Sequence, residues 1–252
     1  SQGTISAAAL IQDRKVLRYV GKKYISARRE MGFLVPSKGY EYATIKGHKC
    51  AIIVGDDLSR EHNFDRSVET IISINARRYG KGTMLYRYEM MHNLAFVEGK
   101  NLVMVNQVGG STEIVYDGTS GALNKHGVPV LMMKNFEEDF QIFDTKLADT
   151  MTPVVIPSTY SDRTRLVYEA ARCGLRDFFR KNNYEKAAVG LSGGIDSAVV
   201  ACLAVDALGA GNVHALLMPS PFSSEDSVED AKELARNLGI EYNVIPIPES
   251  YT

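Results

Sequence analysis

Hydrophobic residues recur along the chain either at helical spacing or in short apolar runs, and these two patterns predict its helices and strands. Residues 83–98 carry Met, Leu, Tyr and Ala side chains at helical spacing, which predicts an amphipathic helix. We also expect a short helix at 64–70 and an ordered surface loop at 26–47. Short apolar runs between turn residues predict strands at 4–11, 15–25, 50–54, 71–75, 102–105, 113–116, 119–123 and 128–132. This mixture is typical of a layered α/β domain.

From residue 162 onward the pattern changes to a regular alternation of strands and helices. The predicted strands lie at 186–191, 213–218 and 241–246, and the predicted helices at 163–181, 196–208 and 225–238. Such alternation indicates right-handed βαβ units and a parallel sheet. Between the two patterns, residues 145–161 contain Pro153 and Pro157, which mark a boundary. We therefore predict a domain at 1–148, a linker at 149–161 and a second domain at 162–252.

Composition narrows the class of protein without selecting a function. The 29 basic and 30 acidic residues give a net charge of −1, so no global field favours nucleic acid or a membrane surface. No apolar run reaches membrane-spanning length, and the N-terminus lacks a signal-peptide pattern. Cys50, Cys173 and Cys202 are an odd number without metal-type spacing, and the five histidines show no metal-type pairing. We expect a cytoplasmic protein.

The most informative stretch is residues 187–197, AAVGLSGGIDS, where an apolar strand runs into a glycine turn and then a helix. Gly193 and Gly194 lack Cβ atoms, so backbone N–H groups can face a bulky anion at the positive end of the helix. Asp196 adds a carboxylate that can hold Mg²⁺ against phosphate oxygens. Together with the serine hydroxyls at both ends of the turn, this pattern predicts a polyphosphate site. An ordinary strand-to-helix turn explains the same residues and stays open.

Ser192–Ser197, Ser-Gly-Gly-Ile-Asp-Ser, resembles the pyrophosphate loop of the ATP pyrophosphatases, and the chain contains neither GxxxxGK[ST] nor GxGxxG. Residues 217–231, from Leu-Met-Pro-Ser to Asp-Ala, resemble the second signature of NAD⁺ synthetases. Residues 106–120, NQVGGSTEIVYDGTS, resemble the closing strands of the nitrilase-type glutamine amidase domain of glutamine-dependent NAD⁺ synthetases. This resemblance implies an α/β fold in which a partial nitrilase-like α-β-β-α layered domain precedes a partial Rossmann-like parallel-sheet ATP-pyrophosphatase domain.

The resemblance also implies roles for individual residues of the second half. Ser223 and Ser224 correspond to a substrate-side loop, although a plain helix N-cap explains them too and both roles can hold together. Asp196 corresponds to the Mg²⁺ ligand. ATP binding falls on Gly190, Leu191, Ser192, Gly193, Gly194, Ile195, Asp196, Ser197, Leu217 and Met218.

The first half departs from the family where amidase chemistry would occur. A nitrilase-type amidase needs a Cys nucleophile, a Glu base and a Lys that stabilises the oxyanion. Lys22 matches the lysine segment, with a solvated strand lysine as the alternative reading, but Gly55 stands where the family has the cysteine. Cys50 lies five residues earlier, on the opposite face of its strand, and Arg77 stands where a small polar residue is expected. The matching Glu would lie before Ser1. We infer a degenerate amidase domain that has kept its scaffold.

By resemblance, the function is ATP-dependent amidation of deamido-NAD⁺ to NAD⁺ through an adenylated intermediate, with release of AMP and pyrophosphate. The implied ligands are ATP, Mg²⁺, deamido-NAD⁺ and a nitrogen donor, either glutamine or free ammonia. The resemblance further implies a homo-oligomer and no nucleic-acid or membrane partner, and we expect the chain to be an internal piece of a longer protein. Another ATP pyrophosphatase amidotransferase and a non-catalytic scaffold remain the alternatives. The sequence does not decide whether glutamine hydrolysis survives.

Overall fold

The computed structural model describes residues 4–25, 32–38, 41–157 and 162–247. Their contacts divide the chain into two compact units, Ser1–Gly109 with Tyr116–Arg163 and Gly110–Val115 with Thr164–Thr252. Both units combine helices with sheets, and the parallel pairings predicted for the second one are present, as the α/β class requires. The domain bounds at 148 and 162 stay a prediction, and residues 158–161 of the expected linker lie outside the described residues.

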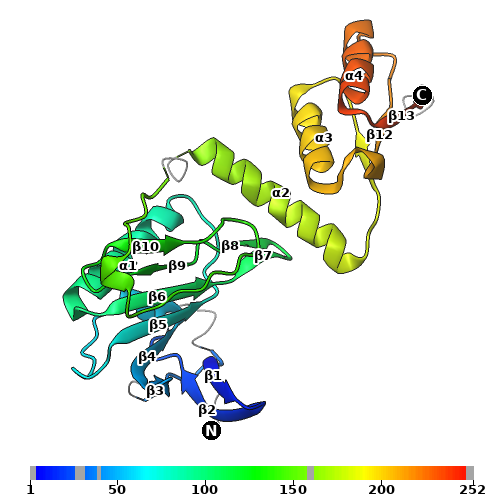
Figure 1. Cartoon of the computed structure of the whole chain (residues 1–252). Helices are drawn as coiled ribbons and strands as arrows, with labels where there is room; N and C mark the ends of the chain where they lie inside the picture. Colours follow the sequence, from blue (N-terminus) through cyan, green and yellow to red (C-terminus); the bar gives the residue numbers. More distant parts are fainter. Residues whose placement is uncertain (1–3, 26–31, 39–40, 158–161, 248–252) are drawn as a thin grey trace. The chain divides into compact units, whose positions relative to one another are not determined.

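The first unit is built on a six-stranded sheet of order β10-β9-β6-β5-β4-β3 (Figure 1). The three central strands β4, β5 and β6 are parallel, and the outer strands pair antiparallel. β1 and β2 form a separate hairpin, and so do β7 and β8, whose tip Gly110–Val115 is grouped with the second unit. The strands span Ala7–Gln12 (β1), Lys15–Gly21 (β2), Glu41–Ile45 (β3), His48–Val54 (β4), Thr70–Asn75 (β5), Asn101–Asn106 (β6), Val108–Ser111 (β7), Ile114–Asp117 (β8), Gly121–Leu123 (β9) and Pro129–Met132 (β10), with short 3-10 turns at Gly55–Ser59 (η1) and Ala148–Thr150 (η2).

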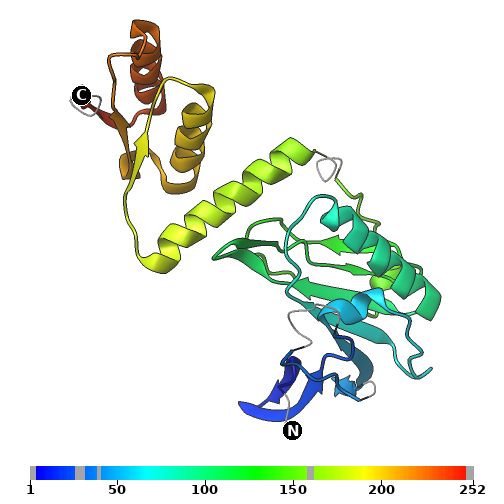
Figure 2. The same ribbon diagram turned by 180° about the vertical axis from the view of Figure 1, so that it is seen from behind.

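Helix α1, Thr83–Glu98, covers one face of this sheet against β6 and β9 (Figure 2). Its predicted bounds are confirmed at both ends. Gly82 and Gly99 flank it in left-handed conformations, and the Gly99 N–H closes the last turn on Ala95 O and Phe96 O. Met84, Met91 and Leu94, which helped to define the pattern, are buried in the core of the unit.

The short helix expected at 64–70 is wrong, because a local side-chain turn replaces it. Asp65 Oδ1 accepts the Ser67 N–H at 2.8 Å and the Ser67 Oγ–H at 2.5 Å. Such bonds satisfy the backbone without a helical ladder, and Asp and Ser therefore favour turns over helices. These contacts also hold the pKa of Asp65 far below its ordinary value, with the Ser67 hydroxyl as the largest cause.

The surface loop expected at 26–47 contains a strand that the sequence reading missed. β3 pairs with β4 across a two-residue turn, Lys46-Gly47, in which both residues have positive φ. The first strand regions also end differently from the prediction, since β2 stops at Gly21 and not at residue 25. Residues 26–31 and 39–40 of the expected loop lie outside the described residues.

A buried ion pair ties α1 to the end of β8. Arg87 is 1% exposed and its guanidinium contacts both carboxylate oxygens of Asp117, at 3.0 and 3.2 Å. The Asn106 amide and the Thr119 hydroxyl donate to the same carboxylate at 3.3 and 3.1 Å. Charges buried this deeply are tolerated when they are paired and hydrogen-bonded.

The second unit contains the predicted parallel sheet, with order β11-β12-β13. The order of elements along the chain alternates as the sequence indicates. They span Arg163–Asn182 (α2), Ala187–Gly190 (β11), Ile195–Leu208 (α3), the 3-10 turn Ala210–Asn212 (η4), Val213–Leu217 (β12), Glu225–Leu238 (α4) and Glu241–Val244 (β13).

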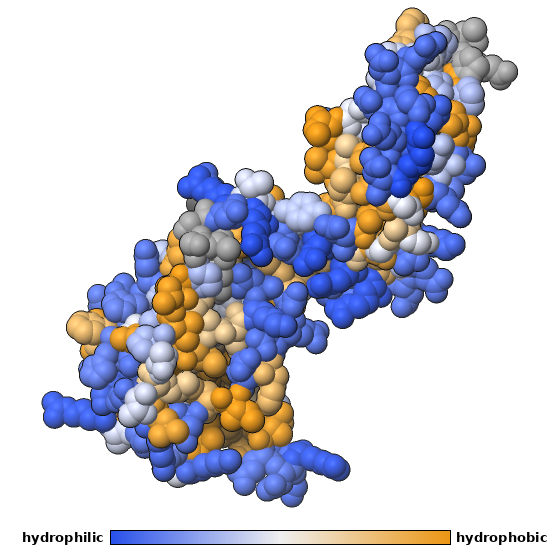
Figure 3. Space-filling view, turned by 45° about the horizontal axis from the view of Figure 1, so that its top comes forward, coloured by the Kyte–Doolittle hydropathy of each residue, from blue (hydrophilic) through white to orange (hydrophobic). Residues whose placement is uncertain are grey.

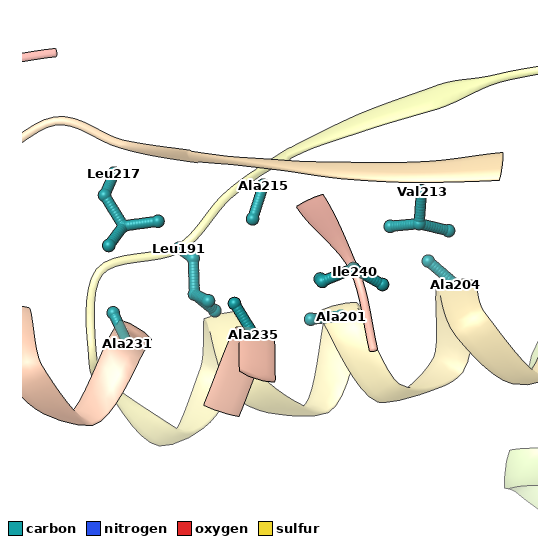
Figure 4. Packing of buried hydrophobic residues seen from close by; sticks show 9 residues of the cluster. All are labelled: Leu191, Ala201, Ala204, Val213, Ala215, Leu217, Ala231, Ala235 and Ile240. Atoms are coloured by element: carbon teal, nitrogen blue, oxygen red, sulfur yellow. The ribbon is translucent and has the colours of Figure 1, made fainter. Parts of the chain in front are cut away.

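Alternate residues of β12 hold α3 and α4 against this sheet. Val213, Ala215 and Leu217 point from the strand toward the two helices (Figure 4). The helices meet them with small side chains, which let backbones approach closely, and the cluster is completed by Leu191, Ala201, Ala204, Ala231, Ala235 and Ile240.

The surface of both units mixes hydrophilic and apolar residues (Figure 3). Several large apolar side chains are more than 80% exposed, among them Phe140 and Ile142 in the first unit and Phe222 in the second. None of the helices in the described part of the chain is both long and apolar enough to cross a membrane.

We expect Arg87→Met to lower the free energy of unfolding by about 3–5 kcal/mol, because it leaves the Asp117 carboxylate buried without its counter-charge. Chemical denaturation followed by circular dichroism measures the change. Lys134→Ala is the control, because it removes an ion pair with Glu137 whose side chains are 65% and 48% exposed, and such pairs contribute little. An Arg87→Met variant as stable as the Lys134→Ala variant would contradict this account.

Candidate functional site

Two loops of the second unit meet at one edge of its parallel sheet. The first follows β11 and leads into α3, and the second follows β12 and leads into α4. Because β11 and β12 are adjacent and parallel, both loops leave the sheet at its carboxyl edge. Ligands of open α/β sheets bind at this edge.

A pocket of about 240 Å³ lies between these loops. Its lining has an apolar part, which includes Leu191, Met218 and Val228, and a hydroxyl part formed by three serines. None of the lining residues carries a charged side chain. The complete lining is Gly190, Leu191, Ser192, Leu216, Leu217, Met218, Pro219, Ser223, Ser227, Val228 and Ala231.

The first loop is organised by two serine hydroxyls. Ser197 Oγ donates to Gly194 O at 2.9 Å and lies 3.1 Å from Ser192 Oγ. The Ser192 N–H in turn donates to Ser197 Oγ at 3.2 Å. Helix α3 begins after Gly194 without a side-chain cap, so first-turn N–H groups are left for another acceptor. This arrangement suits an anion at the helix start.

Gly193 is the residue that the loop geometry demands. Its φ is +83°, and a Cβ added there would lie 2.1 Å from the carbonyl oxygen of Ser227. Gly194 differs, since its φ is −84° and an added Cβ would make only ordinary contact with Ser192 Oγ at 3.5 Å. The two glycines of the motif therefore have different physical roles.

The structure brings six of the predicted site residues into the pocket lining, namely Gly190, Leu191, Ser192, Leu217, Met218 and Ser223. Gly193, Gly194 and Ser197 shape the adjoining loop, while Ile195 is 76% exposed and Asp196 is exposed at the start of α3. Ser224 is the N-cap of α4 and accepts the Ser227 N–H at 3.2 Å, so the capping role is confirmed.

One wall of the pocket comes from α4, where Ser227, Val228 and Ala231 line it. The sequence reading placed Ser227 and Ala231 within the second signature but assigned no site role to any of the three. Their spacing of three and four residues, directly after a capping serine, places them on one face of the first turns of the helix. That spacing was the available signal.

Among the described residues, no group of three or more His, Cys, Asp or Glu side chains is arranged to hold a metal ion. Asp196, exposed in the first turn of α3, offers a carboxylate adjacent in sequence to Ser197. A single carboxylate fits Mg²⁺ that is held mainly by substrate phosphates and water, and does not fit a dedicated all-protein cage.

In the first unit, Lys22 lies directly beside Gly55. A Cβ added at residue 55 would lie 3.4 Å from Lys22 Cε and 3.5 Å from Lys22 Nζ. Lys22 is 5% exposed, so its reading as a solvated strand lysine is wrong. Its ammonium group contacts Asp56 Oδ2 at 3.0 Å, and Arg77 approaches the other oxygen of Asp56 at 3.4 Å. Burial lowers the pKa of Arg77, and Asp56 opposes that change.

The buried Asp57 carboxylate holds the segment that carries Lys22 in place. It is 3% exposed, and its carboxylate accepts the N–H groups of Lys23 at 3.0 Å and Tyr24 at 2.8 Å. The Val54 N–H reaches the same carboxylate at 3.4 Å. These hydrogen bonds connect the segment after β2 to the segment after β4. The connection places Lys22 next to residue 55.

Cys50 is the cysteine of the first unit, five residues before Gly55. Cys50 is 5% exposed within β4, and burial raises the pKa of its thiol, so the nucleophilic thiolate is disfavoured. Cys173 is buried in α2, where burial likewise raises its thiol pKa.

Comparison with known proteins agrees with this geometry. Residues 167–252 match the family model described as NAD synthase. A glutamine-dependent NAD(+) synthetase of Aquifex aeolicus is 36% identical over 82% of this chain and 43% of its own length. One from Synechocystis is 34% identical over 82% of this chain and 40% of its length. The chain thus spans less than half the length of these curated relatives.

The solved structures give the same result for the fold. The glutamine-dependent NAD+ synthetase of Acinetobacter baumannii, determined with ADP, superposes with a TM-score of 0.85 over 98% of this chain and 48% of its own, at 29% identity. The second unit thus matches the NAD synthase family over residues 167–252. The chain as a whole is similar to the glutamine-dependent NAD⁺ synthetases.

We expect Gly193→Ala to lower the free energy of unfolding by about 2 kcal/mol, because it combines left-handed strain with a backbone clash. Gly194→Ala should leave stability unchanged or raise it by up to about 1 kcal/mol, since its backbone suits alanine. Denaturation followed by circular dichroism compares the two. Equal effects of the two substitutions would show that the close approach to Ser227 does not constrain the loop.

Proposed function

We propose that the protein is an NAD⁺ synthetase that amidates deamido-NAD⁺ at the expense of ATP. The reaction activates the nicotinate carboxylate by adenylation, releases pyrophosphate, and ends when ammonia displaces AMP. The observation that carries this proposal is the pocket beside the Ser192–Ser197 loop, in a domain that matches the NAD synthase family.

The pocket suits the nucleoside part of ATP. Its apolar part, formed by side chains such as Leu191 and Met218, offers a surface for a planar base, and the serine hydroxyls offer neutral hydrogen-bonding groups. The relative from Acinetobacter baumannii was determined with ADP, which supports nucleotide binding at a corresponding site.

The loop suits the polyphosphate part. Backbone N–H groups at the start of α3 and the hydroxyls of Ser192 and Ser197 would bind phosphate oxygens and orient the α-phosphate for attack by the carboxylate. As charge develops on the leaving pyrophosphate, the same fixed donors would stabilise it without reorganisation. Mg²⁺, which Asp196 would help to hold, supplies further charge neutralisation when bound.

For the nitrogen source we propose free ammonia. A thioester cannot form at residue 55, because glycine offers no nucleophile there. Asp56 and Arg77 surround the Lys22 ammonium with an ion-pair cluster, and the buried Cys50 thiol has a raised pKa. These features support a first unit that has kept the amidase scaffold without its chemistry.

We further propose a cytoplasmic homo-oligomer. Free cysteines without disulfides fit a reducing compartment. The exposed apolar side chains of Ile195, Val199 and Val200 on α3 offer a surface for association. A scaffold without catalysis is the remaining candidate, favoured only by the loss of the amidase nucleophile, and it predicts no nucleotide binding.

Full-length protein supplied with deamido-NAD⁺, ATP, Mg²⁺ and ammonium is expected to form NAD⁺ and AMP in equal amounts, as measured by chromatography. Glutamine at the same concentration should give no more NAD⁺ than the ammonia present in it as an impurity can produce. Efficient turnover with glutamine would mean that another nucleophile acts in the first unit. Absence of turnover with either donor would favour the scaffold.

Asp196→Ala is expected to reduce NAD⁺ formation with ammonium by at least about a hundredfold, a loss typical of removing a group that stabilises transition-state charge. The matched control is Asp206→Ala in the same helix, which removes an exposed carboxylate that accepts from the Tyr168 hydroxyl at 2.5 Å. The control should stay within about threefold of the parent. Undiminished turnover in Asp196→Ala would overturn its role.

A further inference from the structure

The loop after β11 and the helix after β12 touch through their backbones. An added Cβ at Gly193 would lie 2.8 Å from the Cα and carbonyl carbon of Ser227, as well as 2.1 Å from its oxygen. Gly193 therefore rests directly against the Ser227 peptide group, with no side chain between them. This contact joins the Ser192–Ser197 loop, called the phosphate loop below, to the first turn of α4.

Ser227 also faces the pocket, where its hydroxyl is held in place from within α4. Its Oγ lies 2.7 Å from Ser224 Oγ, and its N–H is capped by the same Ser224 hydroxyl. Ser223, the preceding residue in the chain, lines the pocket, and its Oγ accepts the Ser220 N–H at 3.0 Å. Ser192, Ser223 and Ser227 thus line the same pocket.

We propose that Ser227 is a positioning and binding residue of the nucleotide site. Its peptide group supports the phosphate loop at Gly193, and its hydroxyl hydrogen-bonds the nucleotide in the pocket. The proposal rests on the proposed NAD⁺ synthetase function, and it adds α4 to the elements that hold the nucleotide. A ligand that contacts Ser223 or Ser224 would therefore also affect the position of the phosphate loop.

The physical reason is that backbone contacts transmit displacement better than flexible side chains do. A shift of the first turn of α4 must move Gly193, because closely packed groups resist compression. The Ser224 cap fixes that turn, so the Ser227 hydroxyl is held ready for a ligand and loses little freedom when it binds.

Binding of Mg·ATP to the purified chain, measured by calorimetry, tests the hydroxyl. Ser227→Ala is expected to weaken binding roughly fivefold to tenfold, which corresponds to one lost hydrogen bond. Its melting temperature should stay that of the parent, because Ser224 still caps the helix. Ser227→Thr keeps the hydroxyl and should restore affinity. Glu233→Gln, at an exposed position on α4 outside the pocket lining, is the matched control and should bind as the parent does.

Hydrogen exchange without nucleotide tests the backbone contact separately. Gly193→Ala should accelerate amide exchange both in its own loop and in the first turn of α4, whereas Gly194→Ala should not affect α4. An effect of Gly193→Ala confined to its own loop overturns the supporting role. Unchanged ATP affinity in Ser227→Ala, with a parent chain that binds, overturns the binding role alone. A parent chain that does not bind ATP overturns the proposed function itself.

Discussion

The parallel pairing of β11 with β12 is the constraint on which the candidate nucleotide site depends. It aligns Gly190 with Leu216 and so brings the ends of the two strands to the same level. Two loops that are far apart in the sequence then share one edge of the sheet. The apolar side chains of β12 hold the helices that follow both loops, so the core that stabilises the unit also sets the width of the pocket. The same strands thus supply residues to the pocket lining and to the hydrophobic core.

A comparable constraint operates in the first unit, where Asn106 joins segments that would otherwise be independent. Its amide donates to Gly118 O at 2.9 Å and to Asp117, and its oxygen accepts the Arg77 N–H at 2.8 Å. Asp117 is held by Arg87 from α1. The network therefore reaches from a helix buried against the sheet to the residue that faces Asp56. None of these bonds involves residue 55, so the network does not depend on a side chain at that position.

Sequence reading predicted the elements that have a periodic apolar pattern. Its predictions were wrong or missing where a single hydrogen bond or a short turn determines the local structure. α1 and α4 match their predicted bounds because periodic apolar faces and flanking glycines or a serine cap act together. The helix at 64–70 failed because one carboxylate, Asp65, captures the Ser67 N–H. β3 was missed because a five-residue strand with a two-residue turn gives little periodic signal. The burial of Lys22 was not predicted, because it depends on the contact of the neighbouring Lys23 N–H with Asp57 across 34 residues, which no local pattern reveals.

Gly193 and Gly194 of the Ser192–Ser197 loop show why a sequence motif alone does not determine a site. Composition treats Gly193 and Gly194 alike, yet only Gly193 has a left-handed backbone and a neighbour too close for any side chain. That neighbour is the peptide of Ser227, in the element that forms the far wall of the pocket. The glycine is thus required as much by the packing of α4 as by the phosphate it would face. A displacement of α4 would therefore move Gly193 as well, and under the proposed function a substrate that contacts α4 would act on the Ser192–Ser197 loop.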